Sequence, residues 1–277
     1  MRTAAERESD RRFFVGLARA FAGAVLFSLP LLMTMEMWWL GFSLDGGKLV
    51  VFMLVMVPVL VALDYFSGFD ETSGWREAVG DGMVAYGVGV VASFVILFLF
   101  GIVDVGQPVR EVVGKVAIQS VPASFGAVLA NSQLAGGRGS AFERRRQRAG
   151  YGAQLFIMAA GAGFLAFNVA PTEEMILIAF FMTPWHRLLL VVASLLMMHA
   201  FVFASVFRGA APRHRTSGWG LFLRYTVVGY VVALIVSAYV LWTFGRMEDS
   251  EYASYLMMTI VLGFPAALGA AAARLII

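Results

Sequence analysis

The chain has 277 residues, of which 60% are hydrophobic and only 14% are charged, and its mean hydropathy is +0.79. A water-soluble domain cannot bury that much apolar surface, so the composition indicates an integral membrane protein with the lipid bilayer as its first partner. Cysteine is absent, which excludes disulfide frameworks and thiolate chemistry. The net charge of +3 would suit nucleic acid, but the basic residues cluster in short loops beside apolar stretches, so we expect no nucleic-acid partner.

Eight apolar stretches are each long enough to cross the roughly 30 Å of hydrocarbon in a bilayer, and they predict an all-α, eight-span protein. They run over residues 13–43, 49–66, 82–103, 112–134, 151–183, 188–207, 221–245 and 253–275. With the N-terminus inside, thirteen of the 21 basic residues fall in cytoplasmic segments and five in outside loops. We therefore expect both chain termini in the cytoplasm.

The two halves of the sequence resemble each other. A shift of 138 positions places residues 13–42 on residues 151–180 without a gap, and shifts of 144 and 143 align the later spans. Each repeat holds four spans, so both enter the membrane from the same side and are predicted to be parallel, with a symmetry axis along the membrane normal. The expected organisation is a cytoplasmic segment 1–12, repeat 1 over 13–136, a basic cytoplasmic linker 137–150 and repeat 2 over 151–277.

The first stretch of each repeat is too long for one span. As continuous helices, the 31 and 33 residues of 13–43 and 151–183 would reach roughly 46–50 Å. Pro30 and Pro171 offer the break, because proline removes a backbone donor and clashes with the preceding turn. Proline-interrupted segments at matching positions of two repeats are typical of transport sites.

Acidic residues follow each predicted break. Thr34 precedes Glu36, and Thr172 precedes Glu173 and Glu174, in a pattern that predicts a helix start with carboxylates in its first turn. Glu36 and Glu174 occupy equivalent positions and could face each other, sharing a proton or holding a cation, with the threonine hydroxyls and freed carbonyls as further oxygen ligands.

A second interpretation of these carboxylates stays open. Trp38 and Trp39 follow Glu36 directly and resemble an interfacial aromatic belt, so the glutamates could lie at the membrane surface as helix caps. Glu173 has no acidic twin, since its counterpart is Met35, and it is the weaker candidate.

His199 lies near the middle of the sixth predicted span, where it could relay protons or simply bond to a neighbouring carbonyl. Its counterpart is Val61, so any role is confined to repeat 2. The fourth and eighth spans carry small residues at four-residue spacing around Pro122 and Pro265. Such faces allow tight helix packing, which predicts a place inside the bundle or at a subunit contact and leaves a homo-oligomer open.

Several motifs are missing from the sequence. It has no phosphate-binding glycine loop, no metalloprotease motif and no nucleophile elbow. We therefore expect no catalytic residues, no metal centre and no cofactor, and we rank an intramembrane enzyme last. The stretch 168–174, Asn-Val-Ala-Pro-Thr-Glu-Glu, together with the eight-span layout, resembles a bacterial family of integral membrane proteins without an assigned function. That resemblance implies a bacterial inner membrane and brings no substrate.

The leading hypothesis is a transporter or channel for a small cation, with or without coupling to protons. Glu36 and Glu174 would bind or gate, helped by Thr34 and Thr172. The alternative is a non-transporting scaffold or sensor that acts through its basic cytoplasmic loops, above all the arginines of residues 144–148.

Overall fold

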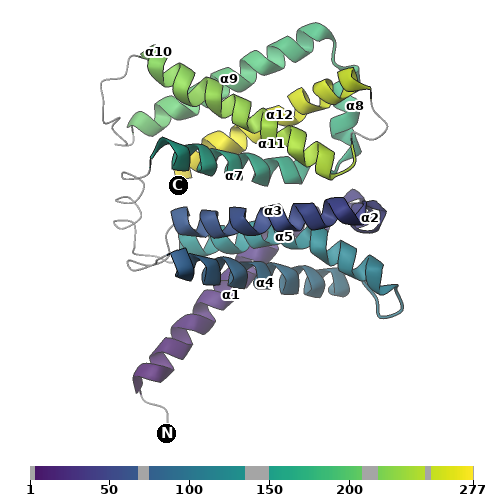
Figure 1. Ribbon diagram of the computed structural model, residues 1–277, viewed down its shortest axis with the longest axis vertical. Helices are drawn as coiled ribbons and strands as arrows, with labels where there is room; N and C mark the ends of the chain where they lie inside the picture. The colour runs from purple at the N-terminus through teal and green to yellow at the C-terminus, as the bar shows by residue number, and fades with distance from the viewer. Residues whose placement is uncertain (1–3, 68–74, 135–149, 208–217, 247–250, 277) are drawn as a thin grey trace. The chain divides into compact units, whose positions relative to one another are not determined.

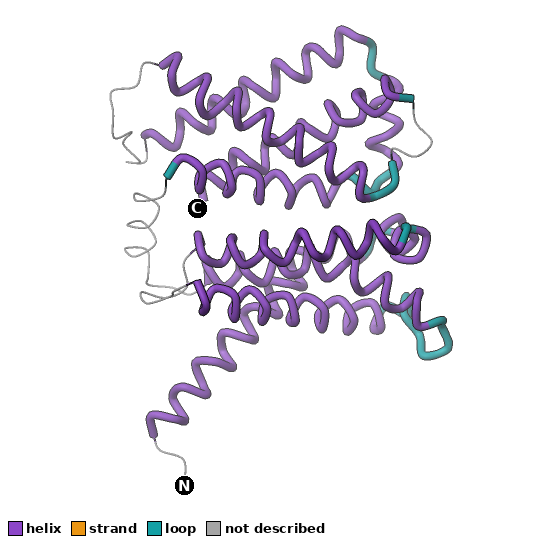
Figure 2. The backbone as a smooth tube through the Cα atoms, viewed as in Figure 1, coloured by secondary structure: helices purple, strands orange, loops and turns teal. Residues whose placement is uncertain are grey.

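The computed structural model describes residues 4–67, 75–134, 150–207, 218–246 and 251–276. Within these residues the chain is helical and contains no strand (Figure 2). Eight of the described helices are long and apolar enough to cross a membrane, which confirms the all-α, eight-span prediction. The chain divides after Arg144 into two compact units, and each is described here by itself. The predicted linker 137–150 lies outside the described residues except for Gly150.

The first unit consists of a long helix, a short helix that follows it closely, and three further long helices (Figure 1). Its helices are α1 (Ala4–Leu32), α2 (Met35–Ser43), α3 (Gly46–Ser67), α4 (Trp75–Leu99) and α5 (Val109–Leu134). Helix α4 begins at Trp75, seven residues before the expected span. The expected span began after the polar residues Arg76, Glu77 and Asp81, but these residues are helical too and lengthen α4 by two turns.

The second unit has the same order of long and short helices. Its elements are α7 (Tyr151–Val169), α8 (Glu173–Phe181), α9 (Pro184–Phe207), α10 (Gly218–Leu221), the π-helical segment η1 (Phe222–Val227), α11 (Val228–Thr243) and α12 (Tyr252–Ile276). The stretches expected at 13–43 and 151–183 are thus each one span plus a nine-residue helix.

The last helix of each unit is its central helix. Helix α5 packs against α1, α2, α3 and α4, and α12 packs against α7, α8, α9 and α11. Every residue from Gly114 to Val128 is buried. The small residues predicted to permit tight packing therefore do so within each unit.

Matching glycines make the tightest helix crossings. A Cβ atom on Gly126 of α5 would lie 2.5 Å from the carbonyl oxygen of Gly23 on α1. In the second unit, a Cβ on Gly269 of α12 would overlap the carbonyl oxygen of Gly161 on α7 in the same way. Only glycine allows the two backbones to touch at these points, which explains why these residues match between the repeats.

Candidate functional site

In the first unit, α1 continues through Pro30 and ends at Leu32, and the three carbonyls of its last turn each accept a hydrogen bond from a side chain. The hydroxyl of Thr34 donates to Pro30 (2.6 Å), the side-chain amide of Gln119 to Leu31 (2.9 Å) and the indole of Trp38 to Leu32 (2.7 Å); these bonds tie α2 and α5 to the end of α1. The Leu31 carbonyl also accepts from the backbone N–H of Thr34 at 3.0 Å, so both of its lone pairs are used and a cation at this break would be left with the second lone pairs of Pro30 and Leu32.

The break in the second unit is capped by different donors. Thr172 occupies the N-cap position of α8, but its hydroxyl donates backwards to the carbonyl of Val169 at 2.9 Å. The guanidinium of Arg246, which follows α11, donates to the carbonyl of Pro171. Two of the carbonyls at this helix end, those of Val169 and Pro171, thereby have donors, as apolar surroundings require.

The carboxylates lie at the starts of the short helices. Glu36 is half-buried on α2, while Glu173 and Glu174 are exposed on α8. Among the described residues, none donates a hydrogen bond or forms an ion pair with these three carboxylates. Glu36 belongs to the first unit and Glu174 to the second, so their facing arrangement stays a prediction.

The length of α7 places the second break near one boundary of the hydrocarbon. Its 19 residues rise about 28 Å, close to the thickness of the apolar layer. Helix α8 then runs across the direction of the long helices, at the end of the unit where α7 ends and α9 begins (Figure 1). This geometry favours the interfacial position that the sequence left open for Glu174.

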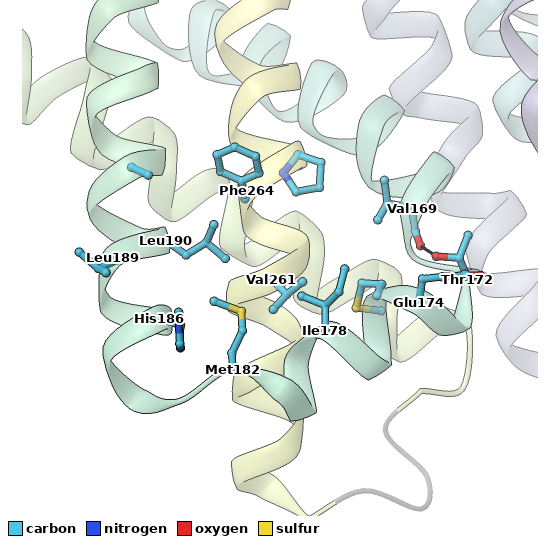
Figure 3. A pocket seen from close by; sticks show the side chains of 13 residues that line it. Val169, Thr172, Glu174, Ile178, Met182, His186, Leu189, Leu190, Val261 and Phe264 are labelled. Atoms are coloured by element: carbon cyan, nitrogen blue, oxygen red, sulfur yellow. Dashed lines mark hydrogen bonds between the residues drawn. The ribbon is translucent and has the colours of Figure 1, made fainter.

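A pocket of about 700 Å³ lies beneath α8, between α8, α9 and α12 of the second unit (Figure 3). Its lining is mainly aliphatic, with Ile178, Leu190 and Val261 among the contributors. Thr172 and Glu174 lie at one end and His186 at the other. Of the residues predicted to form a site, the structure therefore brings Thr172 and Glu174 into one pocket, whereas Glu173 does not line it.

His186 is the pocket residue that the sequence analysis missed. It lies in the first turn of α9, and its Nδ1 is 2.8 Å from the hydroxyl of Thr183, which precedes the helix. The matching positions of the first unit are Asp45 and Lys48, where the Asp45 carboxylate accepts from the backbone N–H of Lys48. The signal that could have pointed to His186 is the polar residue at the start of each span that follows a broken helix.

Helix α2 packs on α5 more closely than α8 packs on α12, and this difference explains the pocket in the second unit. Gly41 of α2 lies directly against Gly114 of α5, so that a Cβ on Gly114 would overlap the Gly41 carbonyl oxygen. The matching residues of the second unit are Ala179 and Met257, whose side chains forbid that backbone contact. Helix α8 accordingly packs less extensively on α12 than α2 does on α5.

His199 lies outside this pocket, thirteen residues further along α9 than His186, or about 20 Å along the helix axis. Its Nδ1 is 3.1 Å from the hydroxyl of Thr226, a buried residue of the π-helical segment. The matching residues in the first unit, Val61 and Gly82, make an apolar contact. The polar pair is thus particular to the second unit.

These features define an all-helical, multi-pass integral membrane protein. The chain belongs to the family described as putative integral membrane protein (DUF2391), whose model matches residues 16–277. No curated protein and no solved structure matches the chain.

Proposed function

We propose that the protein is a transporter or channel for a cation, with or without proton coupling, and that Glu174 is its capture residue. The observation that carries the proposal is the pocket of about 700 Å³ that opens beside this carboxylate at a proline-broken helix. A carboxylate beside an apolar pocket can receive a cationic group, and no described residue pairs with Glu174.

Glu36 is the second residue of the proposal. It holds the matching place on α2 and is half-buried, with Thr34 before it as Thr172 precedes Glu174. We place the protein in a bacterial inner membrane with both termini cytoplasmic, which makes the pocket open toward the outer side.

The test is cation flux into proteoliposomes under gradients of sodium, potassium, calcium and protons. The Glu36→Gln, Glu174→Gln double variant is expected to lose flux while keeping its fold, because glutamine preserves size and removes charge. Glu77→Gln is the matched control, since Glu77 is exposed in the first turn of α4 and the 22-residue helix α3 separates it along the chain from α2. Normal flux in the double variant would contradict the proposal.

The alternative scaffold function makes the opposite prediction. The arginines through which a scaffold would act, within residues 144–148, lie outside the described residues. A folded wild type that carries no cation under any gradient would favour the scaffold, particularly if replacing these arginines abolished the protein's effect in cells.

A further inference from the structure

The donor set of the pocket bears on the kind of cation it takes. Hard metal cations are held in proteins by several oxygen ligands at short distance, mostly carboxylates and carbonyls, with water completing the shell. The pocket offers only three polar side chains, those of Thr172, Glu174 and His186. His186 lies at the opposite end of the pocket from the other two (Figure 3). No group of three metal-ligating side chains occurs among the described residues. A bare metal ion is therefore poorly matched to this lining.

The size and lining of the pocket match a larger ligand. A volume of about 700 Å³ is within the range of sites for organic molecules, which are mostly apolar with a few polar groups that fix orientation. The walls are formed by Ile178 of α8, Met182 directly after that helix, Leu190 of α9, and Val261 and Phe264 of α12. Such walls can hold a hydrophobic body of several rings or a branched chain.

The charge at the pocket selects the sign of the ligand. The carboxylate of Glu174 is at one end and is not engaged by a described residue. The guanidinium of Arg246, at the break, donates to the Pro171 carbonyl and does not line the pocket. A carboxylate beside apolar walls attracts positive charge more strongly than one surrounded by water on every side, so a cationic group is favoured here.

The position of the pocket agrees with an amphipathic ligand. The break lies near one boundary of the hydrocarbon, and α8 lies across the ends of the spans. Leu189 and Ile178, which are 63% and 48% exposed, bring the pocket to the surface of the unit. A ligand could enter with its apolar body among the span residues and its charge at the interfacial carboxylate.

We infer that the second unit binds a lipophilic organic cation, with the charged group at Glu174 and the apolar body between α8, α9 and α12. The inference rests on the proposed function, in that Glu174 receives a cation, and it names the class of that cation.

The test is equilibrium binding of radiolabelled tetraphenylphosphonium to the full chain in phosphatidylcholine nanodiscs. Tetraphenylborate, of the same shape and opposite charge, separates charge recognition from simple partition into apolar space. We expect saturable binding of the cation in excess of that to nanodiscs without protein, and no such excess for the anion.

Three variants locate the site. Glu174→Gln is expected to weaken binding at least tenfold. Glu173→Gln removes the same charge one residue away, outside the lining, and is expected to weaken it less than threefold. Ala193→Phe fills the pocket from α9 and is expected to abolish binding without changing the charge.

Equal binding of anion and cation would overturn the inference and indicate a groove filled by lipid chains. Equal losses in Glu173→Gln and Glu174→Gln would also overturn it, because only the surface charge would then matter. Flux of an inorganic cation without tetraphenylphosphonium binding would overturn the ligand class and leave the proposed transport intact. Glu174-dependent binding without flux of any cation would support the ligand class and contradict transport.

Discussion

Lys115 and Glu111 form an ion pair one turn apart on α5, with 2.5 Å between Nζ and Oε1. The ammonium also donates to the carbonyl of Ile102 (3.1 Å) and lies 5.6 Å from the centroid of the Phe42 ring. The pair thus joins α5 to α2 and to the loop after α4.

Replacing Lys115 alone leaves the Glu111 carboxylate without its partner. Lys115→Met should destabilise the protein by about 2 to 3 kcal/mol, below the usual cost of a broken buried pair because Glu111 keeps some exposure. The matching residues of the second unit are Met258 and Ser254. The double variant Lys115→Met, Glu111→Ser should therefore recover most of the loss, measured as thermal unfolding in detergent. A double variant less stable than the single one would refute this account.

The contact between Gly41 and Gly114 predicts a steric effect. Gly114→Ala should destabilise the first unit by about 1 to 3 kcal/mol, because the added methyl group forces α2 away from α5. Gly87→Ala on α4 is the control, since a Cβ there meets nothing within 4 Å. Equal melting temperatures for the two variants would show that the helices can separate without cost.

Arg246 predicts an effect on the local opening of α8. Arg246→Met removes the donor to the Pro171 carbonyl and should cost about 1 to 3 kcal/mol, because that carbonyl is left without a partner in apolar surroundings. Hydrogen exchange should rise within residues 173–181. Arg110→Met, at an exposed position on α5, should leave that exchange unchanged. Slow exchange in both variants would mean that α8 is held by its side chains alone.

Gly101 and Gly245 predict matching effects in the two units. Both follow the third long helix of their unit, with φ of +70° and +72°, a left-handed conformation that residues with a Cβ disfavour. Gly101→Ala and Gly245→Ala should each lower stability by about 1 to 2 kcal/mol. A cost in only one unit, measured by thermal unfolding, would indicate that the two turns differ in their tolerance of strain.

The sequence predicted the features that depend on composition and local spacing. The eight spans follow from apolar length, and the central position of α5 and α12 follows from small residues around Pro122 and Pro265. The short helices after Pro30 and Pro171 follow from stretches too long for one span.

The rest depends on distant partners that no local pattern reveals. Gln119 reaches a carbonyl 88 residues earlier in the chain, and Arg246 reaches one 75 residues earlier. The part played by His186 emerges only when α8, α9 and α12 are packed together. The pairing of Glu36 with Glu174 stays a prediction.

The contrast between Gly41–Gly114 and Ala179–Met257 reverses a common intuition about cavities. Here larger residues, not smaller ones, accompany the opening, because they act as spacers between two helix backbones. After a gene duplication, one repeat could thus acquire a ligand site when larger residues replaced two glycines at a helix contact. The other repeat kept its glycines, its close helix contact and its stability.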